Sequence, residues 1–306
     1  MTANQVTVII PTHKRLDSLR LAIESIVNQT LKATEIIIVD DVGDSSVESL
    51  VNEYEKFGTR YIANTEQTGA ATSRNIGARN ATTNLIAFLD DDDTWFVDKL
   101  EKQVSCFSDE TVGLVYSPML LVFPDLKIEY KTSPYTDRIL LPEILVENKI
   151  GGTISVVVRR DWFEKVGGFD ARYKAREEYD LWIRLVRSND YSVQYCDVLS
   201  CRVINVISSS NRISCNIDNY IEAIDLLNDK FQSDVNEHLD AGTKKFRKSM
   251  QANFLASQAM KTGMQWSGVK YFFTAFTLNP SPGTLAKFLA SMFGWKFLIL
   301  LRSKVK

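Results

Sequence analysis

Strand-like and helix-like segments alternate through the first 90 residues of the chain. A β-branched run at residues 6–10, bounded by Pro11, predicts a strand, and apolar residues at helical spacing over 19–27 predict a helix after it. The alternation continues with strands expected at 36–39, 60–63 and 85–89, and with helices expected at 47–54 and 72–80. Such a pattern is typical of a parallel sheet whose strands are joined by right-handed helical crossovers. We therefore expect a mostly parallel α/β sheet flanked by helices.

Polar side chains follow three of these strands. Pro11, Thr12 and His13 come after the first, Asp40 and Asp41 after the second, and four consecutive aspartates, Asp90 to Asp93, after the fourth. The carboxyl ends of parallel strands share one edge of a sheet, which is where ligands bind in such folds. Adjacent carboxylates repel unless a hard cation or bound hydroxyls compensate them, so a divalent metal site is one interpretation. The alternative is a solvated acidic turn that caps a helix starting near Trp95.

A loop and helix at residues 68–77, TGAATSRNIG, add a second possible ligand site to the same edge. They would place a helix N-terminus and Arg74 beside the aspartates, and both suit a phosphate group. The segment has neither the Gly-Lys-Ser/Thr of a Walker loop nor a Gly-x-Gly-x-x-Gly fingerprint.

The second half of the chain is less regular. Strands are expected at 112–116, near 126–130 and at 154–158, with a short helix over 161–166. Another helix is expected to begin near Glu178, which places Glu177 and Glu178 at its N-terminus. The helix dipole alone favours carboxylates there, and a catalytic role is the alternative.

Charge is distributed unevenly along the chain. No acidic residue follows Asp240, and the last 66 residues carry eleven Lys or Arg, whereas the first 240 hold 38 acidic against 25 basic residues. A basic tail on an acidic body indicates a polyanionic partner. Helices are expected at 216–240, 246–265, 268–278 and 285–301; the last contains Lys287 and Lys296 and is short for a bilayer span, so we expect it to be interfacial. Packing of these helices on the core is the alternative.

The four cysteines form no Cys-x-x-Cys pair and have no accompanying histidine cluster. A zinc site or a disulfide framework is therefore not expected, and a reducing cytosol is the simplest compartment. The N-terminus lacks the pattern of a secretory signal peptide.

Six ordered blocks resemble the inverting, nucleotide-sugar-dependent glycosyltransferases of family two. They are VIIPTHKR (8–15), IIVDD (37–41), RNIG (74–77), FLDDDDTW (88–95), VGGFD (166–170) and EEYDLWIR (177–184). The resemblance covers residues 6–211 and implies a GT-A fold with a Rossmann-like sheet. It implies a glycosyltransferase domain at 1–215, with a nucleotide-sugar-binding half at 1–110 and an acceptor-binding half at 111–215. The basic helical region at 216–306 lies outside it.

The resemblance also implies roles for individual residues. The positions expected to bind the nucleotide sugar are Pro11, Thr12, Arg15, Asp41, Arg74, Asp90 and Asp91. Asp92 matches the direct ligand of Mg2+ or Mn2+, with Asp90 nearer the ribose, and Asp93 matches a further acidic position. A cation bridging the leaving diphosphate would neutralise charge that grows in the transition state.

The acceptor side carries two departures from the family pattern. The general base is usually the Asp of a Glu-Asp pair, and here Glu178 occupies that position, with Glu177 as the alternative if the register differs by one. Asp180 and Trp182 are expected to shape the acceptor pocket or to pack. Family members often have a His or an Arg near the diphosphate. Here the His is missing, and Arg212 is a weak candidate for that role.

These observations predict a metal-assisted hexosyltransferase that moves a sugar from a nucleotide diphosphate, most simply UDP, to a lipid-linked or oligosaccharide acceptor in bacterial surface-polysaccharide synthesis. We expect a cytoplasmic protein, peripheral on the inner membrane if the basic tail binds anionic lipid. No nucleic-acid motif accompanies the basic residues, so nucleic acid is not an expected partner. Two alternatives are a nucleotidyltransferase and a non-catalytic nucleotide-sugar-binding scaffold protein.

Overall fold

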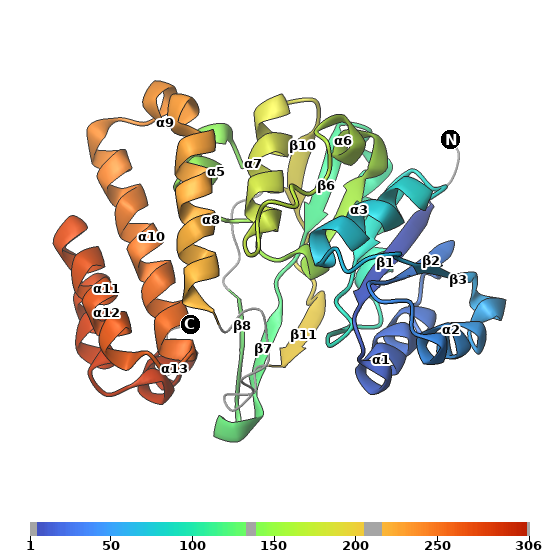
Figure 1. Cartoon of the computed structure of the whole chain (residues 1–306). Helices are drawn as coiled ribbons and strands as arrows, with labels where there is room; N and C mark the ends of the chain where they lie inside the picture. The colour runs from blue at the N-terminus through green and yellow to red at the C-terminus, as the bar shows by residue number, and fades with distance from the viewer. Residues whose placement is uncertain (1–4, 133–138, 205–215, 305–306) are drawn as a thin grey trace.

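The computed structural model describes residues 5–132, 139–204 and 216–304. Within them, a seven-stranded sheet in the order β10-β6-β9-β4-β1-β2-β3 forms the centre of the molecule (Figure 1). Its strands are β1 (Val6–Thr12), β2 (Glu35–Asp40), β3 (Thr59–Ala63), β4 (Leu85–Phe88), β6 (Val112–Tyr116), β9 (Val156–Arg159) and β10 (Ser192–Tyr195).

The direction of the strands brings most of their carboxyl ends to one edge. β1 is parallel to β2 and β4, β2 is parallel to β3, and β10 is parallel to β6. β9 runs antiparallel between β4 and β6. The sheet is therefore mostly parallel, as the alternation predicted, and in this sheet every strand except β9 ends at the same edge.

Helices pack against both faces of the sheet and make two cores. In chain order, the helices before β6 are α1 (Leu16–Val27), α2 (Ser45–Asn52), α3 (Ala70–Asn80) and α4 (Lys99–Ser105). The helices between β6 and β10 are α5 (Leu141–Val146), α6 (Arg160–Lys165) and α7 (Glu177–Ser188). Alternate residues of β1 supply both cores. Ile9 packs with α3 and α7, whereas Val8 and Ile10 pack with α1 and α2 on the other face.

A small second sheet has the strand order β5-β11-β7-β8 and lies below the first in the view of Figure 1. Its strands are β5 (Thr94–Trp95), β7 (Leu120–Phe123), β8 (Ile128–Lys131) and β11 (Cys201–Ile204). The helix expected near Trp95 is wrong: Trp95 pairs with Cys201 in β11, and its buried indole donates to the carbonyl oxygen of Ile154 at 2.9 Å. Helix α4 begins four residues later, at Lys99.

The C-terminal region contains more and shorter helices than the sequence predicted. They are α8 (Ile217–Lys230), α9 (Gln232–His238), α10 (Ala241–Lys261), α11 (Gln265–Leu278), α12 (Pro282–Ser291) and α13 (Trp295–Lys304). The single helices expected at 216–240 and 285–301 are wrong. The first breaks at Phe231, and the second breaks at Gly294, whose φ of +93° no helix accommodates. In the described part of the chain, no helix has the length and apolar character needed to cross a bilayer.

The boundary expected near residue 215 does not coincide with a boundary between cores. Ala223, Leu227 and Phe231 of the C-terminal region belong to the same buried cluster as α5 and α7. A separate cluster forms farther along, around Ala256, Phe272 and Ala290. The division into units at 1–215 and 216–306 stays a prediction, and the shared core indicates that α8 and α9 fold with the body.

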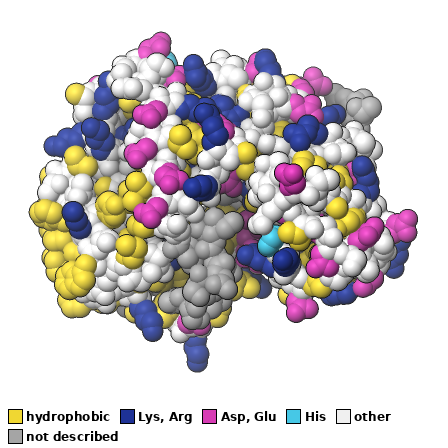
Figure 2. All heavy atoms as spheres, viewed as in Figure 1, with side chains coloured by type: hydrophobic (Ala, Val, Ile, Leu, Met, Phe, Trp, Pro, Cys, Tyr) yellow, Lys and Arg dark blue, Asp and Glu magenta, His cyan; other side chains and the backbone are white. Residues whose placement is uncertain are grey.

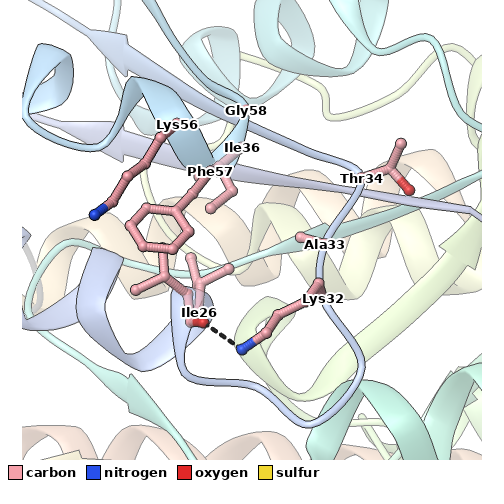
Figure 3. Close-up of a pocket in the computed structure, with 9 residues that line it drawn as sticks. Ile26, Lys32, Ala33, Thr34, Ile36, Lys56, Phe57 and Gly58 are labelled. Atoms are coloured by element: carbon pink, nitrogen blue, oxygen red, sulfur yellow. Dashed lines mark hydrogen bonds between the residues drawn. The ribbon is translucent and has the colours of Figure 1, made fainter.

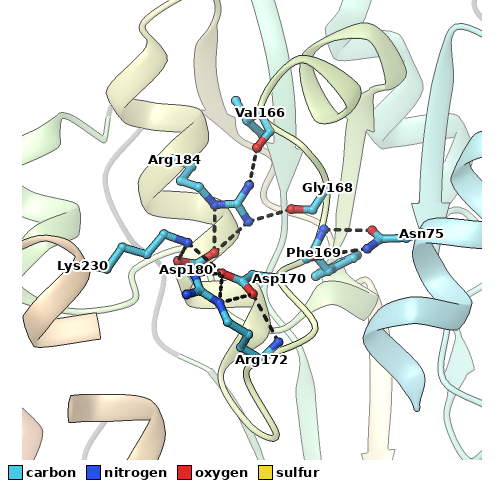
Figure 4. Close-up of polar contacts among 9 residues, drawn as sticks. All are labelled: Asn75, Val166, Gly168, Phe169, Asp170, Arg172, Asp180, Arg184 and Lys230. Carbon is cyan, nitrogen blue, oxygen red and sulfur yellow. Dashed lines mark hydrogen bonds and ion pairs between the residues drawn. The ribbon is translucent and has the colours of Figure 1, made fainter. Parts of the chain in front are cut away.

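Buried charges also tie α8 to the body (Figure 4). The carboxylate of Asp180 on α7 is 0 % exposed and lies 2.6 Å from Lys230 Nζ on α8 and 2.7 Å from Arg184 Nη2. Arg184 also donates to the carbonyl oxygens of Val166 and Gly168, both at 2.6 Å. The cluster therefore joins α7, the loop before it and α8.

Removing the lysine of this cluster should destabilise the fold. Lys230→Met leaves one oxygen of a buried carboxylate without its cation, and we expect the free energy of unfolding to fall by about 3 kcal/mol. Lys174→Met is the matched control because its ion pair with Glu222 also joins the α7 side to α8 but is exposed, so its loss should cost less than about 1 kcal/mol. Urea unfolding of both variants measures the difference, and equal losses would contradict a special role for Lys230.

Candidate active site

The four aspartates after β4 have different surroundings. Asp91 is 5 % exposed and turns inward. Its carboxylate accepts a hydrogen bond from Thr12 Oγ1 at 2.8 Å and forms an ion pair with Arg15 Nη1 at 3.0 Å. The backbone N–H of His13 donates to the same carboxylate at 3.3 Å. Burial raises the pKa of Asp91, although Arg15 and Thr12 oppose the rise. Asp91 thus fixes the loop after β1 to the aspartate turn.

Asp90 and Asp92 are the more accessible members of the run. Their side chains are 35 % and 26 % exposed. Asp92 lies 3.0 Å from Arg15 Nη1, so Arg15 contacts both Asp91 and Asp92.

Arg74 joins the aspartate turn to the N-terminus of α7. Its guanidinium lies 2.6 Å from Asp90 Oδ1 and 2.8 Å from Glu177 Oε1, and its side chain is 5 % exposed. The ring of Phe169 lies 5.5 Å from the guanidinium. Residues that are 103 positions apart in the chain, Arg74 and Glu177, are therefore in direct contact, and the candidate catalytic carboxylates lie beside the candidate donor site.

Helix α3 reaches this position because two residues of the RNIG block bring it close to its neighbours. A side chain at Gly77 would collide with Ile9 of β1, so glycine permits the close approach of α3 to the sheet. Asn75 exchanges two hydrogen bonds of 2.8 Å with the backbone of Phe169, which holds the VGGFD loop (Figure 4). The block is therefore structural as well as a source of Arg74.

Asp41 organises the loop that leads into α3. Its carboxylate accepts from the backbone N–H groups of Thr68 at 2.8 Å and Gly69 at 3.0 Å, and from Asn64 Nδ2 at 3.0 Å. Burial alone would raise the pKa of Asp41, but these hydrogen bonds outweigh it and hold the pKa below its usual value. Asp41 lies at the same edge as Thr12, the last residue of β1, which follows Pro11; the backbone N–H of Asp41 donates to the carbonyl oxygen of Thr12 at 3.0 Å.

Glu178 is partly buried and has a neutral partner. Asn148 Nδ2 donates to Glu178 Oε1 at 3.2 Å. Burial raises the pKa of Glu178 to about 7, and the carboxylate of Glu177 adds to the rise while Arg176 opposes it. A carboxyl with this pKa changes protonation state near neutral pH, as a general base requires.

The helix that carries Glu177 and Glu178 begins in an unusual conformation. Arg176, the residue before it, has a left-handed backbone with φ of +58°, which is rare for a residue with a side chain. Its guanidinium packs over the rings of Tyr179 at 4.6 Å and of Phe254 on α10 at 4.0 Å. These contacts hold the start of α7 in place.

The two residues expected near the acceptor lie in the interior. Asp180 belongs to the charge cluster described above, and Trp182 is 0 % exposed and donates from Nε1 to the carbonyl oxygen of Gly151 at 2.9 Å. Neither side chain reaches the surface of the site. Trp182 is nevertheless linked to the site through Gly151, because Asn148 Nδ2 donates to the carbonyl oxygen of Gly151 and Asn148 Oδ1 accepts from its backbone N–H.

Sequence reasoning placed His13 at this edge without assigning it a role, and it missed Asn148. His13 follows Thr12 in the first block, and its buried Nδ1 has no hydrogen-bond partner within the described residues. Asn148 lies in an irregular stretch with no motif, and only the fold brings it to Glu178. Arg212 lies outside the residues that the structure describes.

The donor set at this edge suits a hard cation. Asp90 and Asp92 offer accessible carboxylate oxygens, the ligands that Mg2+ and Mn2+ prefer. Residues 5–132, 139–204 and 216–304 contain no group of three or more His, Cys, Asp or Glu side chains gathered as a complete metal site. A cation would therefore take further ligands from water and from a bound phosphate, as Mg2+ usually does.

Two hollows elsewhere lie away from this chemistry. One, of about 370 Å3, lies at the amino ends of β2 and β3 and is lined by Lys32, Phe57 and Gly58 (Figure 3). Another, of about 410 Å3, lies near Thr111 and Tyr191 at the starts of β6 and β10. Both are at the edge opposite the aspartates, so we assign neither to the reaction.

Comparison with known proteins identifies the family. The sequence model of the family described as "Glycosyl transferase family 2" matches residues 7–167, more than half of the chain. The chain belongs to glycosyl transferase family 2. The resemblance of the six sequence blocks is therefore confirmed at the level of the family, and the chain is a glycosyltransferase rather than a nucleotidyltransferase.

Bacterial relatives match over most of their length. An uncharacterized glycosyltransferase of Haemophilus influenzae is 26 % identical over 90 % of this chain and 91 % of its own. The putative teichuronic acid biosynthesis glycosyltransferase TuaG of Bacillus subtilis is 28 % identical over 68 % of this chain and 82 % of its own. WfgD of Escherichia coli, a UDP-Glc:alpha-D-GlcNAc-diphosphoundecaprenol beta-1,3-glucosyltransferase, is 24 % identical over 62 % of this chain and 73 % of its own.

Solved structures confirm the GT-A fold. Residues 1–349 of S. aureus TarS in complex with UDP-GlcNAc superpose with a TM-score of 0.66 at 14 % identity, covering 97 % of this chain and 91 % of that one. The mannosyltransferase PcManGT of Pyrobaculum calidifontis, in complex with GDP-Man and Mn2+, gives a TM-score of 0.58 at 15 % identity, covering 99 % and 88 %.

The raised pKa of Glu178 predicts a pH-dependent stability. Its neutral form favours the folded state fully below pH 4.5, the ordinary value, and this contribution is lost as the pH rises through about 7. Glu178→Gln stays neutral, so its stability advantage over the wild-type protein should grow between these two values and be constant above them. Urea unfolding across this range measures it. Glu222→Gln, at an exposed site, is the matched control substitution, and parallel curves for Glu178→Gln and wild type would contradict the assigned pKa.

Proposed function

We propose that this glycosyltransferase moves a hexose from a UDP-sugar, with inversion, to a hydroxyl group of a lipid-linked or oligosaccharide acceptor in surface-polysaccharide synthesis. The contact of buried Arg74 with both Asp90 and Glu177 carries the proposal, because it brings a cation-binding aspartate turn and a carboxylate pair into one site. TarS with UDP-GlcNAc supports a UDP donor. The name of WfgD supports a lipid-diphosphate-linked saccharide as acceptor, which would place the reaction at the cytoplasmic face of a membrane.

The donor would lie at the carboxyl edge of β1, β2 and β4. Pro11, Thr12, Arg15 and Asp41 flank the space for the base and ribose, with Asp91 holding the loop from beneath. Arg74 and Arg15, which pair with Asp90 and Asp92, would supply positive charge for the diphosphate. Asp92, with Asp90, would hold Mg2+ or Mn2+, and the cation would neutralise the charge that grows on the leaving diphosphate.

Glu178 is the proposed general base. In a single displacement, the acceptor hydroxyl gives its proton to the Glu178 carboxylate while its oxygen bonds to the anomeric carbon. The bond from that carbon to the diphosphate oxygen breaks on the opposite side, which inverts the configuration. Glu178 is proposed over Glu177 because Arg74 already pairs with Glu177, whereas the side chain that donates to Glu178 within the described residues is the neutral amide of Asn148. Trp182 and Asp180 would support the acceptor side from behind.

Asp92→Asn should remove metal-dependent donor binding. We expect UDP-sugars with Mn2+ to raise the melting temperature of the wild-type protein, because a ligand that binds the folded state stabilises it. The variant should lose this rise, together with transfer, while keeping the unliganded melting temperature. Asp125→Asn, a residue of the β7–β8 connection, is the control. Full transfer by the wild-type protein in excess chelator would contradict the metal role.

Glu178→Gln should separate binding from chemistry. Donor-induced stabilisation should stay near the wild-type value, and transfer should fall by about 100-fold or more because a general base typically contributes that factor. In the wild-type protein, the transfer rate should rise with pH through about 7 as Glu178 loses its proton.

Glu177→Gln is the comparison for this test. If it abolishes transfer with donor binding intact while Glu178→Gln stays active, the base has been assigned to the wrong residue. Binding without transfer to any acceptor tested, in the wild-type protein, would instead favour the non-catalytic scaffold.

A further inference from the structure

We propose that the outer C-terminal face docks on an anionic lipid bilayer. This face is formed by exposed side chains of α11, α12, α13 and the α12–α13 turn, chiefly Trp266, Phe273, Leu289, Met292, Phe293 and Phe297. Figure 2 shows hydrophobic side chains gathered along the left edge of the molecule, where α11 and α12 lie in Figure 1.

The exposure of these side chains is large for residues of their kind. Trp266 is 78 % exposed and Phe293 is 74 % exposed. Single exposed apolar residues are ordinary, but a contiguous group on one face marks an interaction surface.

Contacts between the helices show that the group is contiguous. The rings of Phe273 on α11 and Phe288 on α12 lie 5.3 Å apart, and those of Phe293 and Phe297 lie 5.2 Å apart. Gln265 Nε2 at the start of α11 donates to the carbonyl oxygen of Met292 at 3.1 Å. The α12–α13 turn therefore lies beside the start of α11, next to Trp266.

Basic residues are interleaved with this apolar group. Lys270 lies one helical turn from both Trp266 and Phe273, and Lys296 lies between Phe293 and Phe297 in the chain; both lysines are exposed. Residues 241–306 contain no acidic residue. An anionic surface would complement this face in charge as well as in apolar character.

The charge pattern distinguishes a bilayer from a second copy of the chain. A symmetric contact through this face would bring the lysines of two copies into one interface, with no carboxylate in the segment to compensate them. Tryptophan at the rim of an apolar face suits the lipid–water interface, where its ring is buried and its N–H stays hydrated. A bilayer satisfies both conditions.

The proposed lipid-linked acceptor gives this surface a purpose, and the inference rests on the proposed function for that purpose alone. Binding to vesicles and binding of donor are measured separately, so either proposal can fail without the other. A variant of this face that loses vesicle binding should keep its donor-induced rise in melting temperature.

Sedimentation of the full chain with lipid vesicles tests the proposal. We expect binding to phosphatidylcholine vesicles that contain phosphatidylglycerol, weaker binding in high salt, and little binding to phosphatidylcholine alone. Trp266→Ser with Phe293→Ser should reduce binding about tenfold or more. Lys270→Glu with Lys296→Glu should remove the preference for anionic vesicles.

Matched controls lie on the body of the protein. Leu21→Ser with Val97→Ser removes side chains that are 57 % and 55 % exposed away from this face, and it should leave vesicle binding unchanged. Lys56→Glu with Lys102→Glu is the matched control for charge: it reverses the charge of two exposed lysines away from this face and should leave vesicle binding unchanged. Equal vesicle binding by wild type and the Trp266/Phe293 variant would overturn the proposal. So would absence of vesicle binding together with dimers, seen by analytical ultracentrifugation, that this variant dissociates.

Discussion

A single buried guanidinium holds the two halves of this glycosyltransferase together at the site. Arg74 neutralises Asp90 from the strand-end turn and Glu177 from the start of α7, and its 5 % exposure means that water does little to screen either contact. Without these two carboxylates, the buried guanidinium would be a poorly solvated charge at the centre of the molecule. The glycine that brings α3 close to β1 and the asparagine that holds the VGGFD loop serve the same arrangement.

Similar acidic residues acquire different chemistry from what surrounds them. In the first turn of α7, Glu177 faces a cation, Glu178 faces an amide in a poorly hydrated environment, and Asp180 is enclosed by Lys230 and Arg184. Of these three, burial gives Glu178 a pKa of about 7. The aspartate run divides in the same way, since Asp91 turns into the protein while Asp90 and Asp92 face outward.

Local pattern predicted the sheet well because strand and helix periodicities are properties of short segments. The parallel strands and the edge at which they end both followed from this local pattern. The pattern could not show that Asp91 turns inward, since that depends on Thr12 and Arg15 from another strand loop. Nor could it place Asn148 beside Glu178, which requires the packing of α5 and α7. The helix breaks at Phe231 and Gly294 were missed because apolar periodicity continues across both.

The left-handed backbone of Arg176 ties the start of α7 to a distant helix. Its guanidinium lies between the rings of Tyr179 of α7 and Phe254 of α10, so the C-terminal region contributes to the support of the start of α7. Recombination among relatives is constrained by this contact. A chimaera that joins the body of one enzyme to the tail of another keeps this contact only if the incoming tail offers a ring where Phe254 stands, so the tail and α7 are best exchanged together.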